Sequence, residues 1–145
     1  MAIKELLIEA QAIQVGVRET DWKKVIRLAA QPLVENGYIL PSYHEAVINN
    51  TLEHGAYYVF EEGVAMPHAR PECGVIKNCF SLVLLDEPIA FADSEKADIV
   101  IMFAACDSNG HIEEGIRAIV NLLGDDDVMA KLRRAKVKEE VIAIL

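Results

Sequence analysis

A histidine flanked by two prolines is the part of the chain whose residue types best suit chemistry. Pro67 precedes His68, and Pro71 follows three positions later, after an apolar run that begins at Val64. Each proline fixes its own φ and favours extended geometry in the residue before it, so the prolines predict a strand that ends in a stiff turn. An imidazole has an unperturbed pKa of about 6.5 and can form covalent intermediates, which makes His68 the candidate nucleophile.

Arg70, two residues after His68, adds a charge that suits anions. A guanidinium is always cationic, and its forked donors match phosphate oxygens. If residues 67–71 are extended, side chains two positions apart project to one face, so Arg70 could contact an anion carried by His68. The residue types alone leave a second interpretation open, in which His68 is a buried turn histidine and Arg70 a surface arginine.

The sequence around His68 resembles the active-site segment of the phosphotransferase-system (PTS) IIA proteins of type 2, the mannitol/fructose type, and most resembles their ascorbate-specific branch. The resemblance extends from about Trp22 to the C-terminus. It rests on an ordered set of segments: Glu62 to Glu72 with Gly74 and Val75, Phe80 to Val83, Glu87 to Ile89, Ala104 to His111, and Ile119 to Leu123. Such a set at family spacing is more specific than an isolated Pro-His pair.

The resemblance implies a phosphotransferase that carries a phosphoryl group between proteins. By motif position, His68 is phosphorylated by the small histidine phosphocarrier protein, and His111 is the supporting histidine. The group then passes to a cysteine of a IIB partner, and a membrane IIC permease is involved only indirectly. Ascorbate or a related sugar acid or pentitol is the expected sugar. A regulatory IIA-like protein, whose phosphorylation state controls other proteins, would have the same site and is the alternative.

Two other histidines bear on this site. His111 follows a cap-rich loop, residues 107–110, and is predicted in the first turn of a helix. A helix N-terminus disfavours an imidazolium and attracts phosphate, so His111 is expected to be a neutral donor to phospho-His68; a turn histidine bonded to its own loop is the alternative. His54 is predicted at a helix C-terminus, where the dipole favours its cation. Mannitol-type relatives supply an arginine from the corresponding helix, and its absence here shifts the cationic role to Arg70. His44 is expected at the surface.

Three histidines, His54, His68 and His111, also raise the possibility of a zinc site, because catalytic zinc can use three histidine ligands and an open position. The chain has no H-E-x-x-H pairing, however, and a dication would repel Arg70. It also has no G-x-x-x-x-G-K-[ST] loop, which argues against an ATP-dependent kinase. We therefore expect no metal and no cofactor, and a protein as the phosphoryl donor.

Length, composition and charge limit the domain number, the partners and the location that the chain can have. The 145 residues, of which 52% are hydrophobic, suit a single domain, residues 1–145. A net charge of −9 opposes nucleic-acid binding and favours basic protein partners. The sequence starts with neither a signal nor a transit segment and has no run as long as a membrane span, so a cytoplasmic location is expected. A homodimer is possible, although no signature indicates one.

The three cysteines show no C-x-x-C spacing, which opposes a disulfide framework. Cys79 and Cys106 are predicted to be core residues, and Cys73 a partly exposed thiol near His68.

The N-terminal half predicts two consecutive helices after one strand. Residues 2–10 suit a short amphipathic helix and residues 12–17 an edge strand. Thr20 is the predicted N-cap of a helix that ends at Gly37. Its buried stripe is Trp22, Val25, Ala29 and Leu33. Ser42 and Glu45 have capping-box spacing, which predicts a second helix from there to about His54.

The remaining residues predict a sheet and the helices that cover it. Residues 56–60 and 64–66 suit two strands with a turn at 61–63, and residues 80–85 suit a third. Residues 98–105 are almost continuously apolar, as expected of a strand buried on both faces, so helices must cover both sides of the sheet. The helical periodicity of residues 112–123, and helices over 126–133 and 137–145, supply that cover. The predicted fold is α/β (α+β), a three-layer α/β/α sandwich with a mixed central sheet.

Overall fold

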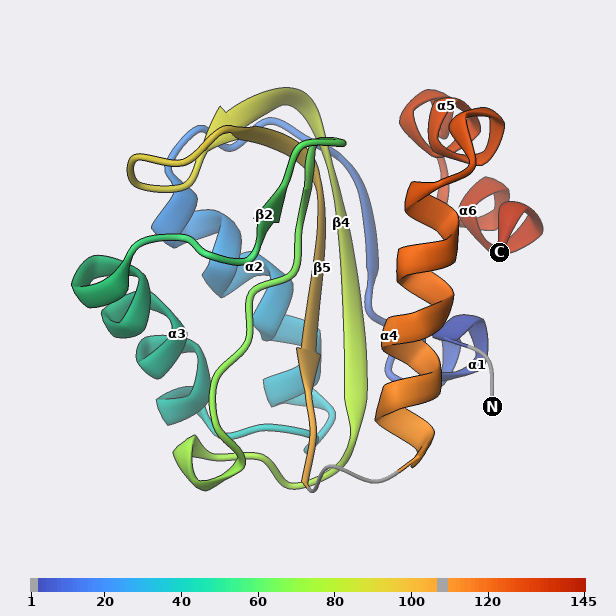
Figure 1. Ribbon diagram of the computed structural model, residues 1–145. Coiled ribbons are helices and arrows are strands. Elements are labelled where there is room, and N and C mark those ends of the chain that lie inside the picture. Colours follow the sequence, from blue (N-terminus) through green and yellow to red (C-terminus); the bar gives the residue numbers. More distant parts are fainter. Residues whose placement is uncertain (1–2, 107–109) are drawn as a thin grey trace.

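Helices cover both faces of a central sheet in the computed structural model, which describes residues 3–106 and 110–145. In Figure 1, α2 and α3 lie on one side of the sheet, and α1, α4, α5 and α6 lie on the other. The helices within the described ranges are α1 (Ile3–Glu9), α2 (Trp22–Glu35), α3 (Pro41–His54), α4 (Gly110–Leu123), α5 (Asp126–Arg134) and α6 (Lys138–Ile144). The predicted three-layer α/β/α sandwich is confirmed. No helix of the described residues is long and apolar enough to cross a membrane.

Five strands of the described residues form one mixed sheet in the order β1-β4-β5-β3-β2. They are β1 (Ile13–Val17), β2 (Val59–Phe60), β3 (Val64–Ala65), β4 (Cys79–Ala90) and β5 (Lys96–Ala104). β1 pairs with β4, and β3 with β5, in parallel, whereas the β4–β5 and β2–β3 pairs are antiparallel. β1 lies at one edge, as predicted. The short β2–β3 hairpin at the other edge delivers the chain that follows residue 65 to the side of β5.

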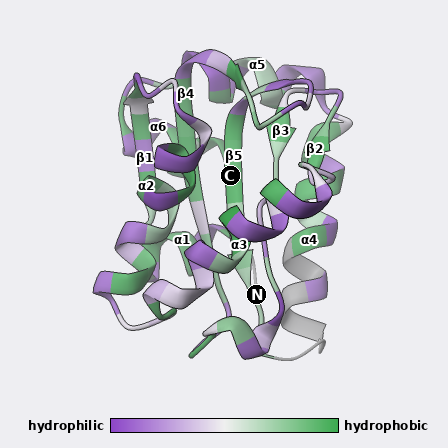
Figure 2. Cartoon of the chain, turned by 90° about the vertical axis from the view of Figure 1, so that its left-hand side faces the viewer, coloured by the Kyte–Doolittle hydropathy of each residue, from purple (hydrophilic) through white to green (hydrophobic). Residues whose placement is uncertain are grey.

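The central strand β5 separates two hydrophobic cores. Because successive side chains of a strand point to opposite faces, Val100 and Met102 pack in the core under α2 and α3, whereas Ile99 and Ile101 pack in the core under α1, α4, α5 and α6. All four side chains are buried. In Figure 2, β5 is green, the hydrophobic colour, along most of its length. The prediction that this strand is buried on both faces is confirmed.

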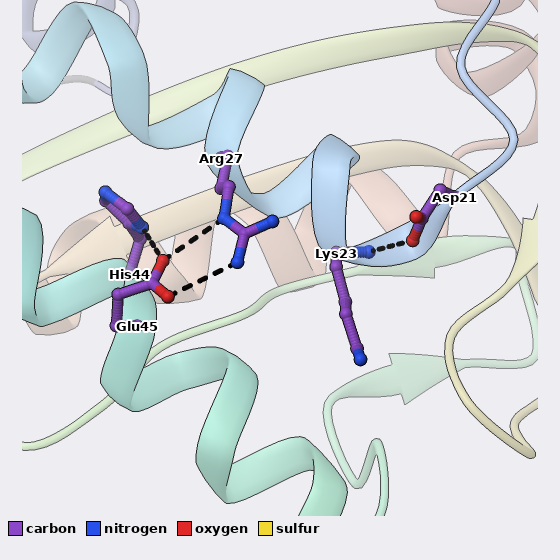
Figure 3. A network of polar contacts seen from close by, with 5 residues as sticks. All are labelled: Asp21, Lys23, Arg27, His44 and Glu45. Atoms are coloured by element: carbon purple, nitrogen blue, oxygen red, sulfur yellow. Dashed lines mark hydrogen bonds and ion pairs between the residues drawn. The ribbon is translucent and has the colours of Figure 1, made fainter.

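Asp21, not the predicted Thr20, is the N-cap of α2. Its carboxylate accepts a hydrogen bond from the Lys23 N–H at 2.9 Å (Figure 3). Thr20 lies one residue too early, and its own N–H donates to the Glu19 carboxylate at 3.0 Å. The carboxylate at the cap also complements the positive end of the helix dipole. Of the predicted stripe, Trp22 is only half-buried, whereas the other three residues are buried.

A polar network joins α2 to α3 (Figure 3). The Arg27 Nε and Nη2 donate to the two carboxylate oxygens of Glu45 at 3.2 and 3.3 Å. The same carboxylate lies 2.7 Å from the His44 Nδ1. The hydrogen bond from Arg27 holds the pKa of Glu45 below its ordinary value. His44 was expected at the surface, but its side chain is only 17% exposed because it lies between the two helices.

The predicted capping box of α3 is wrong. The N-cap is Leu40, without a side-chain cap, and Pro41 occupies the first turn. Proline suits this place because its φ is already helical and the first N–H groups of a helix have no intrahelical partner. Ser42 therefore lies inside the helix, and its hydroxyl donates to the Cys73 carbonyl at 2.8 Å. The predicted end is confirmed, since Gly55 follows His54 with a φ of 82°.

β4 continues five residues beyond the predicted end at Leu85. Its register with β5 shifts between Leu84 and Ile89, and pairing resumes at Ile89 with Ala97. Pro88 lies within this irregular stretch, where a residue without an N–H removes no regular ladder bond. Cys79, at the start of the strand, is buried as predicted, but Cys106 is exposed and its thiol contacts the Ile76 carbonyl at 3.2 Å. The core assignment of Cys106 is therefore wrong, because the residue comes after β5 has ended.

Candidate active site

Backbone hydrogen bonds place His68 beside the end of β5. β3 pairs with β5 through Val64 and Ala65, and the Met66 N–H donates to the Tyr58 carbonyl at 3.0 Å. The Phe103 N–H then donates to the Pro67 carbonyl at 3.3 Å. A proline at position 67 is compatible with this pairing, because its carbonyl and not its nitrogen is used. The chain thus stays extended beyond β3 and presents His68 at the edge of the sheet.

One nitrogen of the His68 ring is held by the backbone. Nδ1 lies 2.8 Å from the carbonyl oxygen of Met66. A carbonyl oxygen only accepts hydrogen bonds, so the contact fixes the proton of the neutral ring on Nδ1 and leaves the lone pair on Nε2. The ring stacks on Phe103, with centroids 4.4 Å apart and an interplanar angle of 23°, and meets Tyr57 edge-on at 5.7 Å. The arrangement leaves Nε2 as the nitrogen that can act as a nucleophile.

The chain after His68 turns through a short 3-10 helix, η1 (Pro71–Cys73). Its C-cap, Gly74, has a φ of 132°, and its carbonyl accepts a hydrogen bond from the Leu40 N–H at 2.8 Å. A Cβ at residue 74 would meet the Ser42 Oγ at 2.6 Å and the Leu40 Cβ at 3.2 Å. Glycine is therefore required here both by the backbone conformation and by the close approach of α3.

An open pocket of about 640 Å³ lies in front of His68. Its walls are formed by α3 and by the segments on either side of the β2–β3 hairpin: Asn50, His54, Tyr57, His68, Ala69, Arg70, Glu72 and Cys73. Arg70 is 84% exposed, and its guanidinium is 4.0 Å from the Glu72 carboxylate. This separation is that of a loose surface pair, so the guanidinium can turn toward an anion in the pocket.

The structure brings most of the sequence candidates together. His68 and Arg70 line one pocket, and so does His54, whose predicted place at a helix C-terminus left open whether it assists His68. His54 is 64% exposed and 3.9 Å from the Glu53 carboxylate. Cys73 also lines the pocket and is half-buried, as expected for a partly exposed thiol. His111 falls in the first turn of α4, but its side chain lies outside the described part of the structure.

Sequence reasoning did not identify three aromatic residues of the site. Phe103 stacks on His68, Tyr57 packs against the edge of the same ring, and Tyr43 contacts the backbone on either side of it. Phe103 lies at the end of a strand correctly predicted as buried, but no local pattern indicates that its ring would reach His68. Among the described residues, no group of three or more His, Cys, Asp and Glu side chains is arranged to hold a metal ion.

Known proteins resemble this chain over nearly its whole length. Residues 6–145 match the family model of the phosphoenolpyruvate-dependent sugar phosphotransferase system, EIIA 2. The ascorbate-specific PTS system EIIA component of Escherichia coli K12 is 35% identical over 147 residues, which cover 100% of this chain and 96% of that protein. The crystal structure of a PTS IIA protein, PtxA, from Streptococcus mutans has a TM-score of 0.92 and 38% identity, and the match covers 99% of this chain and 92% of that one.

A third relative is seen with a partner. IIA mannitol of Escherichia coli, in its complex with phosphorylated enzyme IIB mannitol, has a TM-score of 0.78 and 27% identity, over 93% of this chain and 94% of that one. These similarities extend over nearly the whole chain, and they confirm the resemblance that the segment around His68 indicated, including its similarity to the ascorbate-specific branch. The chain therefore belongs to the EIIA type 2 family of the phosphoenolpyruvate-dependent sugar phosphotransferase system.

Proposed function

We propose that this protein, as one EIIA type 2 domain over residues 1–145, accepts a phosphoryl group from the histidine phosphocarrier protein on Nε2 of His68 and passes it to a cysteine of a IIB partner. The observation that carries the proposal is the 2.8 Å contact between the His68 Nδ1 and the Met66 carbonyl. It holds the imidazole in the tautomer whose free lone pair, on Nε2, can attack phosphorus.

Two displacements complete the transfer. In the first, the Nε2 lone pair attacks the phosphorus of the donor phosphohistidine, the donor P–N bond breaks, and its electron pair remains on the donor imidazole. In the second, a thiolate of the IIB protein attacks the phosphorus, and the electron pair of the P–Nε2 bond returns to His68. Because Nδ1 keeps its proton through both steps, the second leaving group is a neutral imidazole. Positioning and charge stabilisation are the main work left to the protein.

Arg70 and His111 are the proposed charge-stabilising residues. The phosphoryl group brings negative charge into the pocket in front of His68, and the exposed guanidinium of Arg70 lines this pocket. His111 is proposed as a neutral donor because it lies in the first turn of α4, where free backbone N–H groups also favour an anion. The family resemblance of this position supports the role.

The physiological context is also a proposal. The complex of IIA mannitol with phosphorylated IIB mannitol supports a IIB partner for this chain. The ascorbate-specific relatives support ascorbate, or a related sugar acid or pentitol, as the transported compound. A IIC permease would contact that compound, so this chain acts on it indirectly. Such a carrier works in the cytoplasm. The alternative is a regulatory IIA-like protein that is phosphorylated in the same way but controls other proteins.

Phosphorylation with labelled phosphoenolpyruvate and the phosphocarrier system tests the proposal. We expect one acid-labile, base-stable label, located on Nε2 of His68 by nitrogen NMR and absent from the His68→Ala variant. His44→Gln is the matched control, because it removes a histidine outside the pocket and should accept label normally. Label that persists in His68→Ala would overturn the assignment. Addition of the IIB protein separates the two functions, since a carrier loses its label to the IIB cysteine and a purely regulatory protein retains it.

A further inference from the structure

The hydroxyl of Tyr43 joins the backbone on both sides of His68. Tyr43 lies in the first turn of α3, and its side chain has no exposed surface. Its hydroxyl donates to the Phe103 carbonyl at 2.7 Å and accepts from the Ala69 N–H at 3.0 Å, with the Ala69 carbonyl at 3.3 Å. A phenolic hydroxyl has one proton to donate and can accept in return, so one group satisfies two partly buried backbone partners at once.

These two partners belong to residues that adjoin His68, one in the sequence and one in space. Ala69 is the next residue after His68, and Phe103 carries the ring on which His68 stacks. Before His68, the Pro67 carbonyl already accepts from the Phe103 N–H. The backbone of His68 is therefore attached to Phe103 on one side directly and on the other side through Tyr43. Loss of the hydroxyl would release one of these two attachments.

The same turn of α3 also holds the chain that carries Arg70. Ser42 donates to the Cys73 carbonyl and the Leu40 N–H donates to the Gly74 carbonyl, each at 2.8 Å. Residues 69–74 thus form an arch that is fixed to α3 at both of its ends, with Tyr43 at the first end. The guanidinium of Arg70 is exposed and only loosely paired with Glu72, whereas the arch that carries it is hydrogen-bonded to α3.

We propose that Tyr43 is a positioning residue for phosphoryl transfer at His68, which it performs by holding the histidine and its stacking partner Phe103 in a fixed relation. The proposal rests on the proposed function of His68. Burial raises the pKa of Tyr43 well above its ordinary value, so the hydroxyl keeps the proton that it donates to Phe103. Because Tyr43 is fully buried, it cannot contact a partner protein, and its effect must act on the rate of transfer and not on the binding of the partner.

The variant Tyr43→Phe tests the proposal, with Tyr58→Phe as the matched control. Tyr58 is also buried, and its hydroxyl shares a 2.8 Å hydrogen bond with the Thr51 hydroxyl in the same core; among the described residues this hydroxyl has no hydrogen bond to residues 67–70. We expect Tyr43→Phe to lower kcat for phosphoryl acceptance roughly 10- to 100-fold with an unchanged KM for the phosphocarrier, as a small misplacement of reacting groups does. The chemical shifts of the His68 ring protons, followed by proton NMR, should change in Tyr43→Phe and stay constant in Tyr58→Phe.

The outcomes separate this proposal from the function on which it rests. Equal kcat in the two variants, or a raised KM with unchanged kcat in Tyr43→Phe, would overturn the positioning role. If the wild-type protein takes no label on His68, the proposed function fails, and the chemical shifts of the His68 ring in the two variants still show whether Tyr43 orients the ring. If Tyr43→Phe does not fold, proton exchange is measured by NMR in the wild-type protein instead. A slowly exchanging Tyr43 hydroxyl proton close to the Ala69 N–H supports the role, and a freely exchanging one refutes it.

Discussion

The His68 ring is oriented by a neutral backbone oxygen and not by a carboxylate. A carboxylate beside Nδ1 would favour the imidazolium and so remove the lone pair that a nucleophile needs. The Met66 carbonyl, 2.8 Å away, orients the ring and selects the tautomer without adding a negative charge. The hydrogen bond from the Nδ1–H to this carbonyl also becomes stronger once the ring carries a phosphoryl group, because the phosphorylated ring is the more acidic donor. Orientation by a carbonyl thus suits a histidine that must both accept and release phosphate.

At the scale of single residues, the first prediction concerns His111. If its ring donates to the phosphoryl group, His111→Ala should leave the fold intact but slow the transfer, or shorten the lifetime of the phosphohistidine, by roughly one to three orders of magnitude, as loss of one preorganised donor does. Rapid-quench measurement of labelled protein provides the rates, and circular dichroism provides the control for folding. Unchanged acceptance and onward transfer would assign His111 to its local loop.

Arg70 and His54 compete for the cationic role, and pH separates them. Both line the pocket with His68, but an arginine stays charged, whereas a histidine loses its charge as the pH rises through about 6 to 7. We expect Arg70→Ala to accept phosphate much more slowly than wild type at every pH. Arg70→Lys should accept it at an intermediate rate, because lysine keeps the charge but not the planar fork. The rate of His54→Gln should differ little from that of wild type. The rates are measured on either side of neutrality. The reverse ranking, with a rate that falls as the pH rises in the wild type but not in His54→Gln, would transfer the role to His54.

At the scale of elements, α2 contains a proline, and a side chain from β1 replaces the helical hydrogen bond that this proline cannot make. Pro32 lies inside α2 and has no N–H, so the Leu28 carbonyl four residues earlier has no intrahelical partner. The Gln14 side chain, from β1, donates to this carbonyl at 2.6 Å. The bond therefore both satisfies the helix and attaches it to the edge strand of the sheet.

This arrangement predicts that the stability contributed by the Gln14 side chain depends on the presence of Pro32. Gln14→Ala should lower the free energy of unfolding by about 1–2 kcal/mol, because it leaves the half-buried Leu28 carbonyl without a donor. In a Pro32→Ala background the new N–H can take over this carbonyl, so the same substitution should cost clearly less. A double-mutant cycle by urea unfolding measures the difference. Equal costs in the two backgrounds would show that the Gln14 amide contributes independently of the proline.

The elements also show which predictions local sequence can support. Periodicity located α2, α4 and the doubly buried strand β5, because burial on one stripe or on both faces leaves a direct pattern. The caps of α2 and α3 were wrong because several residues near each end can cap, and tertiary contacts choose among them: Ser42 contacts Cys73 instead of capping α3. The end of β4 was placed too early because pairing with β5 resumes beyond the bulge. Their types and spacing singled out His68 and Arg70, which line one pocket, as candidates. No such pattern singled out Tyr43, since its hydroxyl contacts residues 26 and 60 positions away.

At the scale of the whole molecule, the core between the sheet and the helices α2 and α3 contains several groups that must stay protonated. Burial raises the pKa of the Cys79 thiol from 9.0 to about 12 and that of Tyr58 from 10.0 to about 12, and it raises that of Tyr43 as well. All three belong to this one core, and the hydroxyls of both tyrosines are hydrogen-bonded in it. In the unfolded chain the same groups are solvated and ionise near their ordinary values.

The sign of the effect on stability follows from proton binding. Between the unfolded and folded pKa values the folded state binds more protons, so the free energy of unfolding falls as the pH rises. We expect it to be constant near neutrality, to begin to fall at about pH 9, where the unfolded Cys79 thiol ionises, and to fall more steeply above about pH 10, where the unfolded tyrosines join it. Urea unfolding over this pH range gives the curve. Cys79→Ala should move the onset up to the tyrosine range, whereas Cys106→Ala, which removes an exposed thiol, should leave it in place. An onset that is unchanged in Cys79→Ala would show that another group controls the alkaline limit of the fold.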